Sequence, residues 1–251
     1  VFEDVSEDKY IDIKEYFIRL SKKTTSILES IGFELPKDGS VASSMNNCKS
    51  LTEWKKQYFS WMNTPGENTN EINGIFFDFD FVVGDQKIEE SLLSTLYDKI
   101  NTKTLFFDFL GNVALKKPLP LNFFKKFNIE ETGENKGTFD IKSRALSPLI
   151  DAARLLALSM NIRGINNTHS RFKQLAIVDP KYAEIYLNCA DAFLILSKFK
   201  VKEGLKNDNS GQFINLEELN KLDKEKLKNA LAPMRELEEL IKDKFQLTQF
   251  S

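Results

Sequence analysis

The sequence predicts an α+β protein in which the strands lie in the first third of the chain and the remainder is helical. Three observations predict this class: helical apolar spacing near the start, one aromatic and β-branched segment at residues 74–84, and almost continuous helical spacing after it. The 251 residues are enough for one large domain or two ordinary ones. We therefore expect residues 1–100 to hold the strand together with helices and residues 101–251 to form an all-helical domain.

The composition excludes several functional classes. The chain is 41% hydrophobic and 29% charged with a formal net charge of −2, so nothing favours nucleic acid as a partner. Cys48 and Cys189 lack metal-site spacing, and the single histidine, His169, excludes a multi-histidine zinc site. No segment approaches the roughly 20 apolar residues of a membrane helix, and the start lacks a signal-peptide layout. We expect a cytoplasmic protein without a membrane partner.

The first 65 residues predict two helices. The first has one apolar face, followed by Gly32 as a C-terminal cap. Its face comprises Ile13, Tyr16, Phe17, Leu20, Thr24, Ile27, Leu28 and Ile31. The second helix carries Leu51, Trp54, Tyr58 and Trp61, and Pro65 with Gly66 ends it.

Residues 74–84 are predicted to form a buried strand. Because side chains alternate along a strand, Asp78 and Asp80 would point to the same face. Two carboxylates at this spacing can hold Mg²⁺, which prefers oxygen ligands. The alternative is that one acid is exposed at the sheet surface and the other is merely polar.

Beyond the strand, apolar spacing predicts further helices near 87–100, 103–116, 147–161, 168–178, 180–203 and 216–247. Ser147 and Thr168 are predicted N-terminal caps. Pro233 is expected to kink or split the last helix because proline lacks an amide donor.

Charged residues before and within the helix at 147–161 suggest an anion site. Lys142 and Arg144 precede its N-terminus, where a phosphate would be favoured, although a charged turn explains them equally well. Asp151 and Arg154 are three residues apart and would also form an ordinary intrahelical ion pair.

Several segments taken in order resemble one family: bacterial nucleotidyltransferases related to the protein-PII uridylyltransferase, which follow cyclic-nucleotide-binding and CBS domains. The resemblance covers nearly the whole chain, so it is more specific than any single motif. The matching segments are residues 1–5, 39–46 with Trp54, 61–65, 75–80 with Gly84, 118–124, 139–142 and 148–158.

The resemblance implies a Mg²⁺-dependent enzyme that transfers a nucleotide from UTP or ATP to a PII-type protein or a small acceptor. It implies a partial nucleotidyltransferase-like mixed sheet with helices in residues 1–100. It also implies that Asp78 is the third metal-binding carboxylate, that Asp80 replaces the family's usual arginine, and that Lys142, Arg144 and Arg154 line the cleft between the two parts of the chain. The family's first metal-binding D-x-D would precede residue 1. We therefore expect the 251-residue chain alone to be inactive or nearly so.

Two other functions remain open at this point. The first is a degenerate regulatory module that senses nucleotides or docks proteins without catalysis, which Asp80 favours. The second is a helical scaffold that binds a protein through an apolar groove, for which the 21 phenylalanines give slight support.

Overall fold

The structure is a computed structural model that describes residues 1–35, 41–65, 77–100, 104–117 and 119–247. Its contacts form two compact units, one of residues 1–64 and 81–100 and the other of residues 65–80 and 101–251. The predicted division into domains 1–100 and 101–251 stays a prediction.

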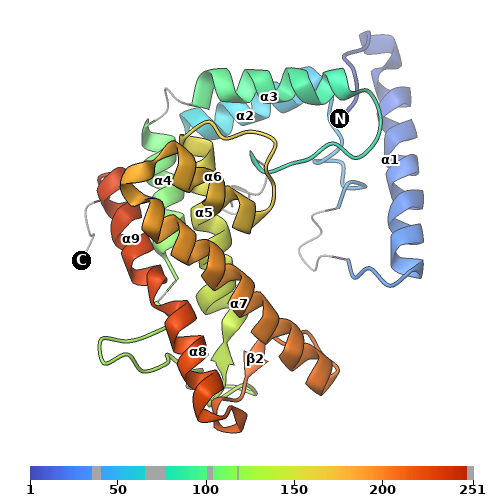
Figure 1. Ribbon diagram of the computed structural model, residues 1–251. Coiled ribbons are helices and arrows are strands. Elements are labelled where there is room, and N and C mark those ends of the chain that lie inside the picture. Colours follow the sequence, from blue (N-terminus) through green and yellow to red (C-terminus); the bar gives the residue numbers. More distant parts are fainter. Residues whose placement is uncertain (36–40, 66–76, 101–103, 118, 248–251) are drawn as a thin grey trace. The chain divides into compact units, whose positions relative to one another are not determined.

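The described chain is mostly helical, as predicted (Figure 1). The first unit contains α1 (Glu7–Ser30), α2 (Leu51–Asn63) and α3 (Gln86–Ile100). The second contains α4 (Thr104–Leu115), α5 (Ser147–Ser159), α6 (Thr168–Val178), α7 (Ala183–Asn207), α8 (Lys221–Leu231) and α9 (Pro233–Lys244). Among the described residues, no helix is long and apolar enough to cross a bilayer.

Local sequence signals explain where several helices begin and end. Ser50 and Glu53 form a capping box at the start of α2. The predicted effect of Pro233 is confirmed, because α8 ends at Leu231 and α9 begins at the proline.

The predicted caps at Ser147 and Thr168 are wrong. Helical backbone precedes Ser147 as a π-helix at Lys142–Leu146, and the Asp140 carboxylate instead accepts from the Ser143 amide at 2.8 Å. Asn167, not Thr168, caps α6 by accepting from the Ser170 amide. The acceptor at α6 is one residue before the predicted cap, whereas Asp140 precedes Ser147 by about two helical turns.

The strand prediction for residues 74–84 is also wrong where it can be compared. Residues 74–76 lie outside the described residues, and residues 77–84 form no strand. Phe77 is buried, and its ring centroid lies 4.8 Å from that of Phe106. Val82 and Val83, in contrast, are 89% and 87% exposed. A strand needs a hydrogen-bonded neighbour, and the described part of the first hundred residues offers only the isolated Phe2–Ser50 bridge.

The named strands lie in the second unit instead. β1 (Phe139–Asp140) pairs antiparallel with β2 (Phe213–Ile214), with Phe139 opposite Ile214. Two residues are too few to produce an alternating pattern, so these strands could not be predicted from the sequence.

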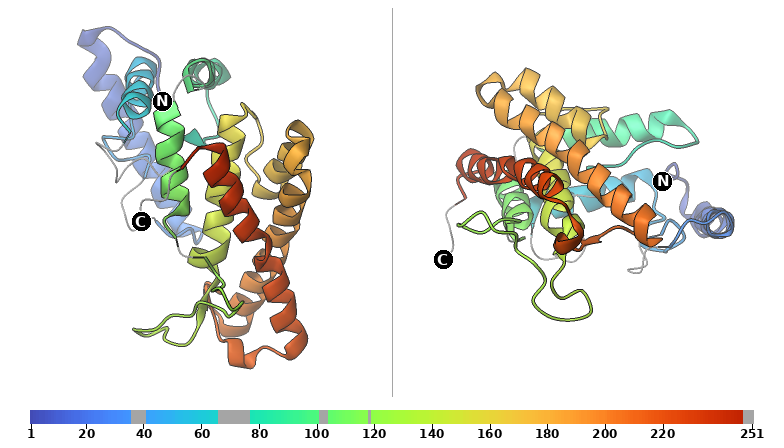
Figure 2. Two further views of the ribbon diagram at one scale, coloured as in Figure 1. Left: turned by 90° about the vertical axis from the view of Figure 1, so that its left-hand side faces the viewer. Right: turned by 60° about the horizontal axis from the view of Figure 1, so that its bottom comes forward.

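Helix α5 lies at the centre of the second unit and contacts α4, α6 and α9 (Figures 1 and 2). Its buried face is apolar, comprising Leu149, Ala152, Ala153, Leu155, Leu156, Ala157 and Leu158. Fully buried side chains around it include Phe106, Phe139, Phe172, Leu175 and Tyr186. This packing fixes the face of α5 that carries the site described next.

Candidate functional site

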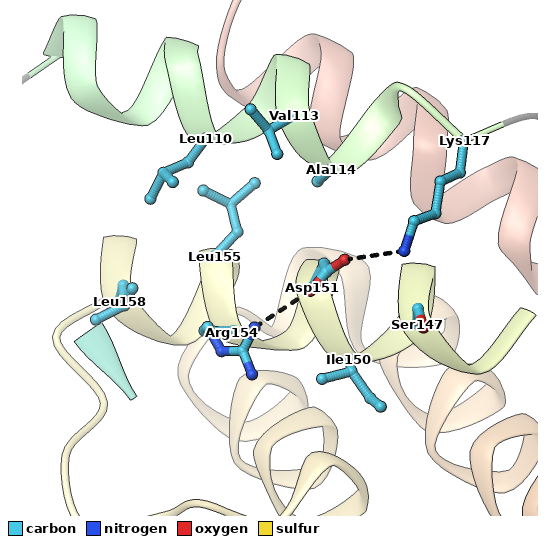
Figure 3. A pocket seen from close by; sticks show the side chains of 10 residues that line it. All are labelled: Leu110, Val113, Ala114, Lys117, Ser147, Ile150, Asp151, Arg154, Leu155 and Leu158. Carbon is cyan, nitrogen blue, oxygen red and sulfur yellow. Dashed lines mark hydrogen bonds and ion pairs between the residues drawn. The ribbon is translucent and has the colours of Figure 1, made fainter. Parts of the chain in front are cut away.

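A cavity of about 420 Å³ lies between α4 and α5 (Figure 3). Its walls are mainly apolar, and its polar groups gather toward one end. The lining comprises Leu110, Val113, Ala114, Lys117, Ser147, Ile150, Asp151, Arg154, Leu155 and Leu158. The α5 members recur at spacings of three and four residues, so helical periodicity brings them to one side of the helix.

Three charged side chains form the polar end of the cavity. Asp151 lies between two cations: its carboxylate is 3.7 Å from the Lys117 ammonium and accepts from Arg154 at 3.2 Å (Figure 3). Burial raises the pKa of Asp151, although the charges of Lys117 and Arg154 oppose that rise. The carboxylate thus holds both cations beside the cavity that their side chains line.

Arg154 also connects this end of the cavity to Asp78. Its Nε donates to Oδ2 of Asp78 at 2.8 Å. Arg171 of α6 donates from Nη1 to the same oxygen at 2.9 Å and from Nη2 to the other oxygen. Both carboxylate oxygens of Asp78 therefore accept from guanidinium groups.

The Asp78 cluster is largely shielded from water. The side chains of Asp78, Arg154 and Arg171 are 11%, 13% and 8% exposed. Burial alone would raise the pKa of Asp78, but hydrogen bonds from Arg171 and then Arg154 outweigh it and lower the pKa below its usual value. Asp78 is thus held ionised.

The five side chains form one network, which we call the ion-pair network: Lys117, Asp151, Arg154, Asp78 and Arg171. Three of these side chains are cationic and two are anionic, so the ionised network carries a net charge of +1. An excess positive charge beside a partly apolar cavity favours an anionic ligand with an apolar part.

The structure brings together some predicted site residues and separates others. Asp78 and Arg154 are hydrogen-bonded, whereas Asp80 and Lys142 are exposed. Arg144 donates from Nε and Nη2 to the Glu130 carboxylate at 2.9 and 2.7 Å and does not line the cavity. The roles of these residues in binding stay predictions.

The predicted Mg²⁺ site does not fit the side chains as they are arranged. A cation at Asp78 would have to displace Arg154 and Arg171 from its oxygens. Within the described ranges, no group of three or more His, Cys, Asp or Glu residues could hold a metal ion. Metal binding by Asp78 and Asp80 stays a prediction, and the site is best described by its cations.

Sequence reasoning missed Lys117 and Arg171. A signal existed for Arg171, because it falls on the buried stripe of α6 with Thr168, Phe172 and Leu175. An arginine on an apolar stripe requires a buried partner, although the sequence does not say which one. Lys117 has no such signal, since lysines at helix ends are common.

Two family models match the chain. The one described as "Putative nucleotidyltransferase substrate binding domain" matches residues 104–245. One described as a putative nucleotidyltransferase matches residues 1–68. No match was found among curated proteins or among solved structures. The cavity and four members of the ion-pair network lie within residues 104–245, while Asp78 lies between the two matched ranges.

Proposed function

This chain belongs to a family of putative nucleotidyltransferases, and we propose that its second unit binds the nucleotide substrate in the cavity between α4 and α5. The observation that carries the proposal is the pairing of apolar walls with a cationic end. The description of the family model for residues 104–245 supports it, since that model is named for substrate binding.

A nucleotide matches both halves of the cavity. Its base is flat and largely apolar, which suits Leu110, Leu155 and Leu158, and its phosphates are anionic, which suits Lys117 and Arg154. Small-ligand pockets span about 300–1,000 Å³, and this cavity of about 420 Å³ lies in that range.

The residues of the ion-pair network would position the phosphates of the nucleotide and stabilise their charge. In nucleotidyl transfer an acceptor oxygen bonds to the α-phosphorus and pyrophosphate leaves, so catalysis depends on holding the phosphates and stabilising developing negative charge. Lys117 and Arg154 would hold phosphate oxygens, and Asp151 would orient both cations. Asp78 and Arg171 would fix the conformation of Arg154. Mg²⁺ supplies further charge neutralisation in such reactions when it is bound.

We also propose the finer assignments implied by the resemblance. These are UTP or ATP as donor, a PII-type protein or small molecule as acceptor, a relation to the protein-PII uridylyltransferase, and upstream cyclic-nucleotide-binding or CBS domains in a signalling protein. Residues 1–100 would form a nucleotidyltransferase-like domain, and the family match to residues 1–68 supports that assignment. We also propose that the 251-residue chain alone is inactive or nearly so.

A second candidate function is nucleotide sensing without catalysis. The engagement of Asp78 by two arginines favours it, because a carboxylate so occupied is a poor metal ligand. Both functions use the same cavity, and they differ in whether Mg²⁺ strengthens binding.

Isothermal titration calorimetry tests the proposal. UTP and ATP are titrated into the chain with and without Mg²⁺, and then into Lys117→Gln and Lys136→Gln. Both lysines are exposed cations, but only Lys117 lines the cavity. We expect Lys117→Gln to weaken binding several-fold and Lys136→Gln to leave it unchanged; equal effects would count against the cavity. Stronger binding with Mg²⁺ favours the enzyme, and equal binding favours the sensor.

A further inference from the structure

A turn in the second unit presents two phenylalanines to solvent. Phe123 and Phe124 are 79% and 77% exposed. Their rings meet edge to face, with centroids 5.6 Å apart. Lys125 and Lys126 follow directly and are exposed as well. We call residues 121–127 the aromatic turn.

Hydrogen bonds fix the shape of the aromatic turn without using its tip. The Asn122 side chain accepts from the amides of Phe124 and Lys126, each at 3.0 Å, and the Asn122 amide donates to the Lys126 carbonyl. Lys125 adopts a positive φ of 56°, a conformation that few non-glycine residues take up. The two phenylalanines are therefore held out by a defined backbone, and little ordering entropy would be lost if they bound a partner.

The base of the turn is anchored to the core. The Phe127 ring contacts the buried Phe139 ring with centroids 5.4 Å apart, and the Lys228 ammonium of α8 lies 5.6 Å from the centre of the Phe127 ring. Exposing two large apolar side chains on an anchored turn is unfavourable in water relative to burying them. A surface of this kind indicates a binding partner.

The same unit carries a groove of complementary character between α7, α8 and the start of α9. Its volume is about 660 Å³. Apolar residues line it, among them Ala192, Ile195, Leu222, Ala230 and Pro233. Its charged residues are three exposed acids, Asp191, Glu225 and Glu236, and one lysine, Lys226. We call it the acidic groove.

The aromatic turn does not fill the groove of its own molecule. Lys228 faces the base of the turn, and Glu225 and Asn229, three residues before it and one residue after it, line the groove. The turn and the groove therefore lie on neighbouring faces of α8. Because Phe123 and Phe124 are exposed and do not line this groove, filling the groove with such a turn requires a second molecule.

We propose that the aromatic turn of one molecule docks into the acidic groove of a second copy of this chain. Phe123 and Phe124 pack against the apolar lining, and Lys125 and Lys126 approach the acids of the groove. In a two-fold dimer each copy provides one turn and one groove, so the contact is made twice. Opposite charges select this pairing over turn against turn or groove against groove.

Sedimentation equilibrium over a range of protein concentrations tests the contact. The double variant Phe123→Ser/Phe124→Ser removes the aromatic tip, and Ile177→Ser/Leu205→Ser is a matched control at apolar side chains that are 72% and 82% exposed. We expect the aromatic variant to dissociate at least about 30-fold more readily, as for a central interface pair, and the control to behave as the wild type. A wild type that is monomeric at every concentration, or equal loss in both variants, would overturn the proposal.

A charge-exchange experiment identifies the two surfaces independently. Lys125→Glu/Lys126→Glu makes the turn acidic, and Asp191→Lys/Glu225→Lys makes the groove basic. Each variant alone has turn and groove of like charge, so each should be monomeric. An equal mixture restores opposite charges at both contacts and should yield one-to-one complexes. A mixture that stays monomeric, or variants that still self-associate, would contradict the assignment. All changed side chains are exposed, and circular dichroism checks that each variant is folded.

Discussion

Arg171 of α6 donates two hydrogen bonds to the carboxylate of Asp78, a residue that precedes it by 93 positions. Arg154 of α5 donates to the same carboxylate. Asp78 thus ties an irregular segment to two helices of the second unit, and the stability of the unit and the direction of Arg154 both depend on it.

Replacing Asp78 should destabilise the protein strongly. Asp78→Ala leaves two largely buried guanidinium groups without their carboxylate, and breaking such a pair from one side costs about 3 kcal/mol or more. Asp80→Ala is the matched control, because Asp80 is exposed and its loss should cost under about 1 kcal/mol. Urea denaturation measures both free energies of unfolding; similar values for the two variants would show that the cluster contributes little.

The contribution of Asp78 should disappear in acid. Its pKa is lowered in the folded state, so it adds stability above its unfolded pKa of about 3.9, and this stability is lost as the pH falls through the folded pKa. We expect the difference in unfolding free energy between wild type and Asp78→Asn to be constant from pH 7 to about pH 5 and to shrink below about pH 4. A difference that shrinks near pH 6 would require another titrating group.

Removing the charge of Asp151 should strengthen anion binding. The side chain in Asp151→Asn can still accept a hydrogen bond from Arg154, but the ion-pair network is left with two excess positive charges instead of one. One unit charge at about 4 Å in water is worth on the order of 1 kcal/mol, which corresponds to a several-fold rise in affinity. Calorimetric titration of ATP at pH 7 measures this change. Weaker binding would mean that Asp151 positions the cations more than it opposes the ligand.

Arg144 should matter for stability and not for nucleotide binding. It pairs with Glu130 and does not line the cavity. We expect Arg144→Gln to lower stability by about 1 kcal/mol or less, as for a partly exposed ion pair, and to leave the affinity for UTP unchanged. Loss of UTP affinity with unchanged stability would return Arg144 to the site, as the sequence had suggested.

The sequence predicted the helices well because their signal is local. Apolar residues at spacings of three and four indicate a helix from about a dozen consecutive residues. A single residue, Pro233, indicates where a helix is interrupted. The strands were misplaced because strand pairing depends on partners far away in the sequence. Residues 77–84 have the composition of a strand, but no described strand pairs with them. β1 and β2 do pair, but each is too short to show an alternating pattern.

The candidate site was predicted only in part for the same reason. Arg154 and Asp78 were both singled out, but as a cleft cation and a metal ligand rather than as partners of each other. Their contact with Arg171, and the approach of Lys117 to Asp151, join four separate segments, and no local spacing encodes that convergence. Local pattern gave the residue types, and tertiary packing determined their partners.

Hydrogen–deuterium exchange with and without UTP tests the central claim most directly. If the nucleotide binds between α4 and α5, UTP should slow exchange in the last turns of α4 and across α5, and leave α8 unchanged. The Lys117→Gln variant should lose most of that protection at the same UTP concentration. Protection confined to another part of the chain, or none at a saturating concentration of UTP, would contradict the assignment of this cavity as the nucleotide site.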